Sequence, residues 1–420
     1  MTAPLMAASP EISDPPPALI GHRAFVIYWC VRTFTNGAYW MQAVAVGWQI
    51  YDLTGSALDL GLVGLVQFVP FVLLAVVVGP VIDRYDRRAI ARICQIVKAL
   101  AALALAAGTL GQWLNRDAFL AILFVTGIAR TFEVPTMHAL VPGLVPPQLL
   151  PRAIAAASTA TQTAVICGPA LGGLLYVFGA ATVYIICTAV FVIASVLVSL
   201  IALNLPPIEK RPFTLKTVFA GFAYVRGRPI LLGAMSLDLF TVVLGGVTAL
   251  LPIFAKDILQ TGPWGLGLLR SAPAVGALVM SVLLARYALE RRVGTILFAV
   301  TGTFGLSILV FALSTSLMLS MAALAVYGAT DAISVVIRHS LVQTRTPNDM
   351  LGRVMAINSM FTGSSGTLGE FRAGAVAAAF GAITSAMIGG VGALVVAGLW
   401  MVLFPQLARV DTIAPRQRAS

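Results

Sequence analysis

Long apolar runs separated by short polar segments dominate this chain. The clearest interruption is Gly79–Arg88, where Asp83, Asp86 and three arginines stand between two apolar runs. A helix needs about 20 mainly apolar residues to cross the hydrocarbon core of a bilayer. The pattern predicts twelve membrane-spanning helices, over residues 25–51, 60–82, 90–111, 119–141, 153–178, 182–203, 230–255, 265–287, 295–313, 317–343, 352–377 and 383–404.

The longest polar stretch, residues 204–228, contains Pro206, Pro207 and Pro212 and predicts a linker between two halves. We expect six-helix bundles over residues 23–203 and 229–404. The flanking segments 1–22 and 405–420 are expected to be tails, since residues 1–19 are rich in proline and lack the pattern of a cleavable signal. The fold class is therefore an all-α membrane protein.

The two predicted halves resemble each other. Gly127–Ser158 aligns without gaps with Gly328–Ser359, and continuing the register pairs Gly168 with Gly369 and Gly173 with Gly374. Chance similarity of apolar runs does not explain the polar matches, which are His138/His339, Pro146/Pro347, Arg152/Arg353 and Ser158/Ser359. Parallel six-helix pseudo-repeats of this kind occur in secondary transporters, with the substrate site between the halves near the midplane.

Composition and charge support a membrane protein. Only 10% of the residues are charged, against about 25% in soluble proteins. The net charge is +11, and most of the lysines and arginines fall in segments that face one side of the predicted bundle. The positive-inside rule predicts that both termini are cytoplasmic and that the protein is a multi-pass inner-membrane protein. The basic excess then faces anionic lipid headgroups rather than nucleic acid.

Several chemistries lack sequence support. The four cysteines all lie in apolar runs without metal-ligand spacing, and the three histidines form no cluster. The chain has no P-loop, no HExxH and no GxSxG motif. We expect no metal, no cofactor and no enzymatic activity. The cysteines are Cys30, Cys94, Cys167 and Cys187.

The interruption at Gly79–Arg88 resembles the G-x-x-x-D-R-x-G-R-R signature that follows the second helix in the major facilitator superfamily. Gly79, Asp83, Arg84, Arg87 and Arg88 match it. Asp86 replaces the usual glycine, and we expect the turn to survive because aspartate tolerates left-handed backbone geometry. The resemblance implies the major facilitator fold and a charge-paired latch between Asp83 and the second half. The matching place in that half has Ala285 instead of an acid.

Within the superfamily, Trp40–Ser56, Leu237–Leu259 and Gly262–Leu278 resemble the branch that contains the enterobactin exporter and macrolide-efflux drug:proton antiporters. The fifth predicted helix carries a glycine-proline motif that is similar to the family's antiporter motif, although Ala164 stands where another glycine is usual. An ordinary packing seam of small residues is the alternative. The motif residues are Gly168, Pro169, Gly172 and Gly173.

Ten charged residues fall inside predicted helices, more than two residues from either end. Each unpaired charge near the midplane costs about 3 kcal/mol on insertion scales, so these side chains must pair, snorkel or line water. Lys98 is expected to snorkel, and Arg338 is expected to be structural. The other candidates for a central cavity or proton coupling are Arg32, Arg130, Glu133, Asp238, Arg270, Asp331, Glu370 and Arg372.

Spacing gives some of these charges expected partners. Arg130 and Glu133 are three residues apart, share a helix face and can pair. Arg130 resembles a family arginine implicated in proton coupling, and Asp331 is its repeat equivalent, which suggests attraction across the cavity. Our hypothesis is that Asp238, Glu133 or Glu370 carries the proton. For each residue, a static charge pair that holds helices together is the alternative.

These observations predict a transporter that exports an apolar or amphipathic drug-like molecule by proton antiport and alternating access. Its expected partners are the small-molecule substrate, protons and membrane lipids, and a monomer suffices. A dedicated siderophore or natural-product exporter is the first alternative. An importer or lipid translocase of the same fold is the second, and a non-transporting membrane sensor is the last.

Overall fold

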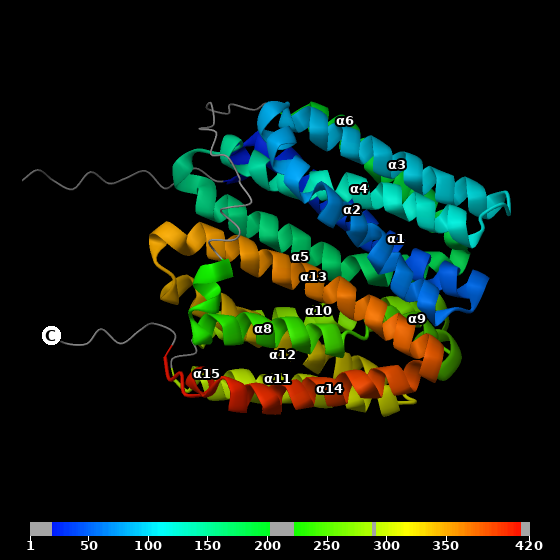
Figure 1. Cartoon of the computed structure of the whole chain (residues 1–420). Helices are drawn as coiled ribbons and strands as arrows, with labels where there is room; N and C mark the ends of the chain where they lie inside the picture. The colour runs from blue at the N-terminus through cyan, green and yellow to red at the C-terminus, as the bar shows by residue number, and fades with distance from the viewer. Residues whose placement is uncertain (1–18, 202–221, 288–290, 413–420) are drawn as a thin grey trace, which may run out of the picture.

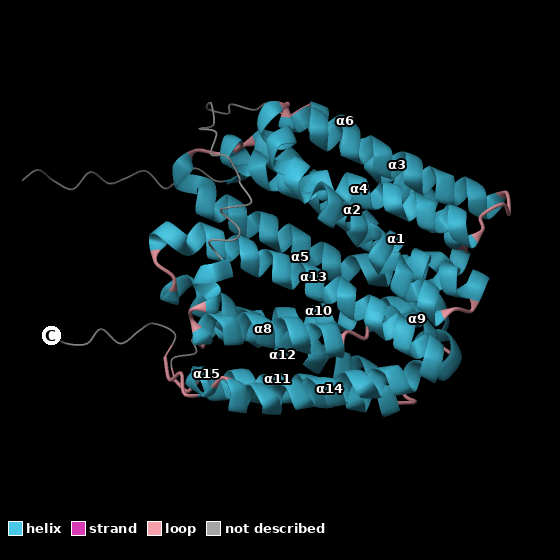
Figure 2. Ribbon diagram, viewed as in Figure 1, coloured by secondary structure: helices cyan, strands magenta, loops and turns pink. Residues whose placement is uncertain are grey.

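The computed structural model describes residues 19–201, 222–287 and 291–412. In these ranges the chain is helical and contains no strand (Figure 2). Parts of both predicted tails and most of the predicted linker, namely residues 1–18, 204–221 and 413–420, lie outside the described residues.

The first half contains six long helices among the described residues. They are α1 (Arg23–Thr54), α2 (Ala57–Arg84), α3 (Arg87–Leu110), α4 (Arg116–Leu140), α5 (Leu150–Leu175) and α6 (Ala180–Ser199). Polar side chains start several of them, as expected for helix N-caps. Ser56 accepts from the Asp59 N–H, Asp86 from the Arg88 N–H and Asn115 from the Ala118 N–H.

The second half follows the same plan. Its helices are α8 (Pro229–Gly245), α9 (Leu251–Ile253), α10 (Gly262–Arg286), α11 (Val293–Leu313), α12 (Leu317–Arg345), α13 (Asn348–Phe380), α14 (Ala382–Leu403) and α15 (Pro405–Ala408). Ten segments of the described chain are long and apolar enough to cross a membrane. The remaining long helices, α1 and α13, have 32 and 33 residues and carry more polar side chains. Together these segments are consistent with the twelve predicted helices.

The predicted span over 230–255 is present as one membrane-crossing segment, Pro229–Ile258, but its helix is interrupted. Helix α8 ends at Gly245, and after a short 3₁₀ turn and α9 the segment finishes in a π-helical turn, Phe254–Ile258. The break lies where two helices meet backbone to backbone, because a Cβ at Gly246 would lie 2.9 Å from the carbonyl carbon of Gly369 in α13.

Helix packing confirms the repeat. In the first half α1 packs on α5, α2 on α4 and α3 on α6. In the second half the equivalent pairs are α8 with α13, α10 with α12 and α11 with α14. The aligned glycines occupy matching contacts. Gly127 of α4 packs on the Gln67 backbone of α2, and Gly328 of α12 packs on the Pro273 backbone of α10. Parallel pseudo-repeats therefore describe the fold.

The halves meet through two equivalent helix pairs, α2 with α13 and α5 with α10 (Figure 1). A Cβ at Gly374 would lie 2.8 Å from the Cα of Gly61, and a Cβ at Gly173 would lie 2.9 Å from the Cα of Gly267. We call these four residues the glycine seam. Small residues permit such close backbone approach between membrane helices.

The glycine seam lies at one end of the bundle. We call this the Gly55 end, because the α1–α2 turn at Gly55 lies there, where α2 and α10 begin and α5 and α13 finish. The opposite end, which holds the turn at Tyr85 and Asp86, is the gate-loop end. Large apolar side chains such as Leu73, Val282 and Val402 are exposed on the outside of the bundle, as expected where lipid is the solvent.

The seam predicts the effect of adding bulk. Gly374→Val should force the Gly55 end apart, because the added Cβ would also lie 2.7 Å from the carbonyl oxygen of Ala57. Spin labels at Leu53 in α1 and Trp264 in α10 should report a longer distance by electron–electron resonance. Gly302→Val in α11 is the matched control, since nothing lies within 4 Å of its Cβ position. An unchanged distance in Gly374→Val would contradict the seam's role.

Candidate functional site

Three side chains of the first half form a cluster toward the second half. The guanidinium of Arg130 in α4 lies over the ring of Tyr39 in α1, 3.6 Å from its centroid. The Tyr39 hydroxyl donates to Oε1 of Gln67 in α2 at 3.4 Å. A cation over an aromatic face is attracted by the ring quadrupole. The contact holds Arg130 without a carboxylate partner, and the expected pair between Arg130 and Glu133 is absent among the described contacts.

The second half adds two opposite charges to this cluster. Arg270 in α10 points at α1, where a Cβ at Gly47 would lie 3.8 Å from its guanidinium. Glu370 in α13 lies against α2, with Oε2 2.8 Å from the Cβ position of Gly64. Arg270 is within electrostatic reach of both Glu370 and Tyr39. We call Tyr39, Gln67, Arg130, Arg270 and Glu370 the central cluster.

The central cluster is incompletely paired. Among the described residues, neither Arg270 nor Glu370 forms an ion pair within 4.0 Å, and the Arg270 Nε is buried without a hydrogen-bond partner. A buried charged group that lacks partners is strongly unfavourable. The arrangement therefore suits a ligand that supplies those partners.

Two polar contacts join the halves at the Gly55 end. Lys256 forms an ion pair with Asp52 of α1, and the Tyr51 hydroxyl donates to Asp257. Lys256 and Asp257 both belong to the π-helical turn Phe254–Ile258. Sequence analysis missed these contacts, because nothing in a linear pattern shows which loops meet across a bundle.

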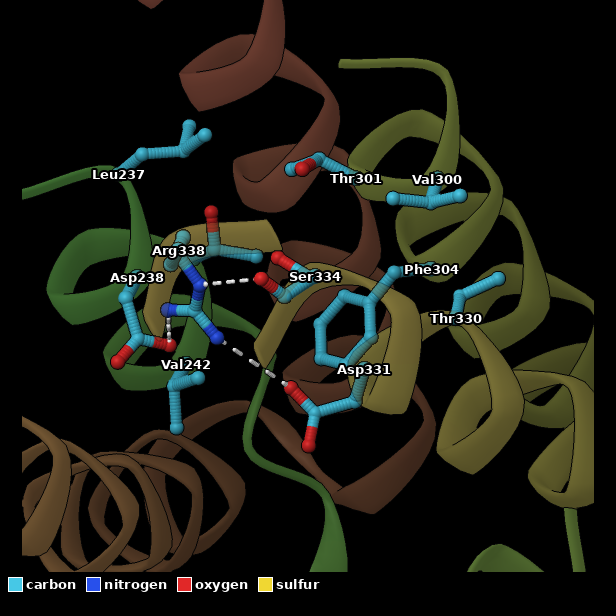
Figure 3. Close-up of a pocket in the computed structure, with 11 residues that line it drawn as sticks. Leu237, Asp238, Val242, Val300, Thr301, Phe304, Thr330, Asp331, Ser334 and Arg338 are labelled. Atoms are coloured by element: carbon cyan, nitrogen blue, oxygen red, sulfur yellow. Dashed lines mark hydrogen bonds and ion pairs between the residues drawn. The ribbon is translucent and has the colours of Figure 1, made fainter. Parts of the chain in front are cut away.

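A second charged cluster lies inside the second half (Figure 3). Arg338 of α12 forms a buried ion pair with Asp238 of α8, and a second guanidinium nitrogen lies 3.9 Å from Asp331 Oδ1. Thr362 of α13 donates to Asp238 Oδ2 at 3.3 Å. Asp331 and Arg130, for which attraction was expected, form no ion pair among the described residues. Arg338, which the sequence predicts to be a structural residue, is the centre of this group.

In the first half, Glu133 pairs with Lys98 instead of Arg130. Lys98 Nζ lies 2.8 Å from both Glu133 oxygens, and Gln95 donates to Oε1 at 2.7 Å. The Lys98 side chain is only 2% exposed, so the expectation that it snorkels is wrong. Tertiary packing against α4 and the ring of Phe191 offers Lys98 a closer stabilising partner than the distant headgroups. Both Glu133 oxygens are paired, although Arg130 of the central cluster is within electrostatic reach of the Lys98–Glu133 pair.

Two other predicted site arginines hold the backbone. Arg32 in α1 donates to the Ala157 carbonyl and the Thr161 hydroxyl of α5. Arg372 in α13 donates to the carbonyl oxygens of Val243, Leu244 and Gly246 at the interruption after α8, and to that of Ser385. Carbonyls freed inside a membrane require such donors. Neither arginine belongs to the central cluster.

The gate loop, Gly79–Arg88, forms side-chain hydrogen bonds and ion pairs only within its own half among the described residues. Arg87 donates to the Ala139 carbonyl and Arg88 to the Ile201 carbonyl, whereas Asp83 and Arg84 form no hydrogen bond or ion pair there. Gly79 lies inside α2. The expected latch between Asp83 and the second half stays a prediction.

Asp86 of the gate loop does not adopt the left-handed backbone geometry that was expected. Its φ of −60° is not left-handed, and its carboxylate caps α3 through the Arg88 N–H. Partial burial raises the pKa of Asp86, but hydrogen bonds from the Arg88 main chain and guanidinium outweigh it and hold the pKa below its ordinary value. The aspartate therefore replaces glycine by capping the next helix.

The glycine-proline motif of α5 serves two interfaces. A Cβ at Gly172 would lie 2.7 Å from the Met41 carbonyl oxygen of α1, and one at Gly168 would lie 2.7 Å from Cβ of Trp40. Gly173 belongs to the glycine seam, and the Pro169 carbonyl meets Gly267 in α10. The motif packs α5 against its own half on one face and against the second half on the other.

The sequence held one unused signal for the central cluster. Aligning Pro70 with Pro273 places Gln67 of α2 opposite Arg270 of α10, so the two halves contribute equivalent positions. Within residues 19–201, 222–287 and 291–412, no three His, Cys, Asp or Glu side chains gather to hold a metal ion.

The Lys98–Glu133 pair predicts a stability effect. Lys98→Met should destabilise the protein by about 3–5 kcal/mol, since it leaves a buried carboxylate unpaired. Lys98→Met combined with Glu133→Leu should recover most of the loss. Unfolding midpoints in detergent measure both variants. Equal losses in the single and double variants would show that pairing is not the cause.

Known proteins resemble this chain over nearly its whole length. The chain is 28% identical over 409 residues to the enterobactin exporter EntS of Escherichia coli (strain SMS-3-5 / SECEC), covering 95% of this chain and 96% of the relative. EntS of Shigella boydii serotype 18 (strain CDC 3083-94 / BS512) matches with the same identity and coverage.

Solved structures share the fold. The nucleoside transporter NupG superposes with a TM-score of 0.72 at 15% identity, covering 91% of this chain and 99% of NupG. A bacterial homologue of the iron transporter ferroportin gives 0.69 at 17% identity, covering 94% and 100%. The family model described as "Transmembrane secretion effector" matches residues 16–419. The chain therefore belongs to this family of major facilitator superfamily secondary transporters.

Proposed function

We propose that this protein is an exporter that works by alternating access and is driven by proton antiport. The observation that carries the proposal is the one-sided closure of the halves. The glycine seam and the Asp52–Lys256 pair close the Gly55 end. At the gate-loop end, no described hydrogen bond or ion pair joins the halves. Closure at one end around a charged central cluster is what rocking of two repeats requires.

The charge distribution supports a direction. The gate-loop end carries most of the lysines and arginines, including Arg84, Arg87 and Arg88. By the positive-inside rule this end faces the cytoplasm, with both termini on that side of an inner membrane. We infer a conformation that is open to the cytoplasm, in which the exporter can load its substrate. A monomer suffices, with lipids as its surroundings.

The central cluster favours a substrate with acidic oxygens over an apolar drug. Arg130 and Arg270 contribute two cations against the one carboxylate of Glu370, Tyr39 contributes an aromatic face, and the Arg270 Nε has no partner. An apolar molecule would leave the excess positive charge and the Arg270 Nε unpaired, which is unfavourable. A siderophore-like natural product suits these groups, and its export is what the EntS name states for the relatives. Export of drug-like compounds is the second candidate, supported by the family resemblance alone.

Transport into inverted proteoliposomes tests the proposal, with enterobactin and ethidium as the probes. A pH gradient, acidic inside, should drive enterobactin uptake and dissipate with it. Arg270→Gln should lower that uptake tenfold or more, since a hydrogen bond to a charged group contributes about 1.5–3 kcal/mol. Arg286→Gln, at the exposed end of the same helix, is the matched control and should transport normally.

The outcomes of that experiment distinguish the substrate class and the direction of transport. Ethidium uptake without enterobactin uptake would favour the drug exporter. Absence of gradient-driven flux for both probes and for a wider solute panel would refute the proposed function. Uptake only in right-side-out vesicles would reverse the direction.

The gate loop predicts a kinetic effect. Asp83→Asn should slow enterobactin transport while expression and topology stay intact, because the resemblance assigns Asp83 to a latch that forms when the cytoplasmic end closes. Flux is measured in the same vesicles, and topology by labelling of single cysteines. Wild-type flux in this variant would reduce the loop to a topological signal.

A further inference from the structure

We propose that Asp238, Asp331 and Arg338 form the proton-binding site of this transporter, separate from the central cluster that binds substrate. The inference rests on the proposed function and adds to it the place where the coupling ion is held. We call these three residues the proton triad. They come from α8 and α12, and Thr362 of α13 joins them through Asp238.

The charge count gives the triad a capacity of one proton. A single guanidinium lies between two carboxylates, so the group carries a net charge of −1 when both acids are ionised. A net charge in a low-dielectric interior is unfavourable. Binding of one proton leaves a neutral Arg–carboxylate pair and one neutral acid. The Lys98–Glu133 pair of the first half is already neutral, with both carboxylate oxygens bonded, and has no such capacity.

Exposure points to Asp331 as the acid that exchanges the proton. The Asp331 side chain is 44% exposed, whereas those of Asp238 and Arg338 are 7% and 5% exposed. Asp331 lies four residues after Tyr327, on the same helix face. Tyr327 is within electrostatic reach of both Asp331 and Glu370. Asp331 is therefore the member of the triad that solvent reaches most easily.

The walls beside Asp331 combine apolar side chains with several hydroxyl groups. The triad borders a small cavity of about 10 Å³. This volume holds about one water molecule. Thr301 and Thr330 line it (Figure 3). Thr241 also lines it, and the Thr241 hydroxyl is buried without a hydrogen-bond partner. A water held there can pass a proton to Asp331.

Partner exchange links the proton to helix packing. Arg338 contacts Asp238 directly and lies 3.9 Å from Asp331, as expected when Asp331 is protonated. When a proton leaves the Asp331 Oδ for water, the new carboxylate attracts Arg338 and weakens its bond to Asp238 of α8. Helix α8 packs on α13, which carries Glu370 and meets α2 of the other half. Loss of the proton thus reaches the interface between halves.

Other titratable or charged groups face the triad and must be separated from it experimentally. The residues of α11 that line the cavity are uncharged. From the remaining neighbouring elements, the groups are Tyr327 and His339 of α12 and Glu370 of α13, and Glu370 is in turn near Arg270 of α10.

Proton binding without substrate tests the triad first. Purified protein in liposomes is taken between acidic and alkaline pH, and difference infrared spectra record the C=O stretch of protonated carboxyls. Asp331→Asn should remove one protonated carboxyl band and about one titrating proton per chain. Asp59→Asn is the control, because Asp59 is a buried carboxylate already paired with Arg116. An Asp331→Asn spectrum identical to wild type, or loss of the band in Glu370→Gln instead, would overturn the assignment.

Transport assays then separate the triad from the substrate site. Asp331→Asn should abolish uptake of enterobactin driven by a pH gradient while keeping exchange of enterobactin at equal pH, which needs no net proton movement. Loss of both modes in Asp331→Asn would place the residue in the substrate site and overturn the proposal. Failure of both modes in the wild type would instead refute the proposed function.

Two further variants keep the test independent of folding. Arg338→Lys retains the charge and should keep proton binding with an altered pH profile. Asp238→Asn leaves Arg338 for Asp331 alone and should shift proton release to lower pH, since an adjacent cation favours the carboxylate. Wild-type pH profiles in both variants would show that the three residues do not titrate as a group.

Discussion

The cost of an isolated charge in lipid governs how this protein is built. The charged side chains within the described membrane-spanning helices pair with an opposite charge, donate to backbone carbonyls or lie between the halves. Lys98 and Glu133 neutralise each other inside the first half. Arg372 satisfies the carbonyls left by the interruption after α8. What remains, Arg270 and Glu370, lies where the halves meet, so the same constraint that stabilises the fold also locates the candidate site.

The second constraint is close approach without hydrophobic driving force. Lipid tails are as apolar as the helices, so membrane helices associate through tight packing of small residues. Glycines occupy equivalent contacts within each half and across the boundary between the halves. The contacts across the boundary gather at the Gly55 end, where the seam glycines meet backbone atoms of the opposite helix. Such an interface can separate and reform, which suits a molecule whose halves rock.

The repeat is symmetric in backbone and asymmetric in charge. The two halves pair their helices in the same order, yet the repeat equivalents Arg130 and Asp331 have opposite charges. Their surroundings differ as well, because Arg130 lies on the ring of Tyr39 whereas Asp331 shares Arg338 with Asp238. One half presents a cation with an aromatic face, and the other holds an acid beside a small cavity with threonine hydroxyls in its wall. Duplication supplied the scaffold, and divergence of a few polar residues supplied two different sites.

The sequence by itself determined the helical membrane fold, the two repeats, the family and the set of intramembrane charges. Apolar run length, aligned glycines and the Gly79–Arg88 motif are local features, and lipid leaves few alternatives to a helix. Tertiary structure alone decided which charges meet. Glu133 forms its ion pair with Lys98 and not with the neighbouring Arg130. Arg338 lies beside two acids, which are 100 and 7 residues away along the chain. Pairing depends on the distances between helices and on the local dielectric, and neither quantity is written in the spacing of residues along one chain.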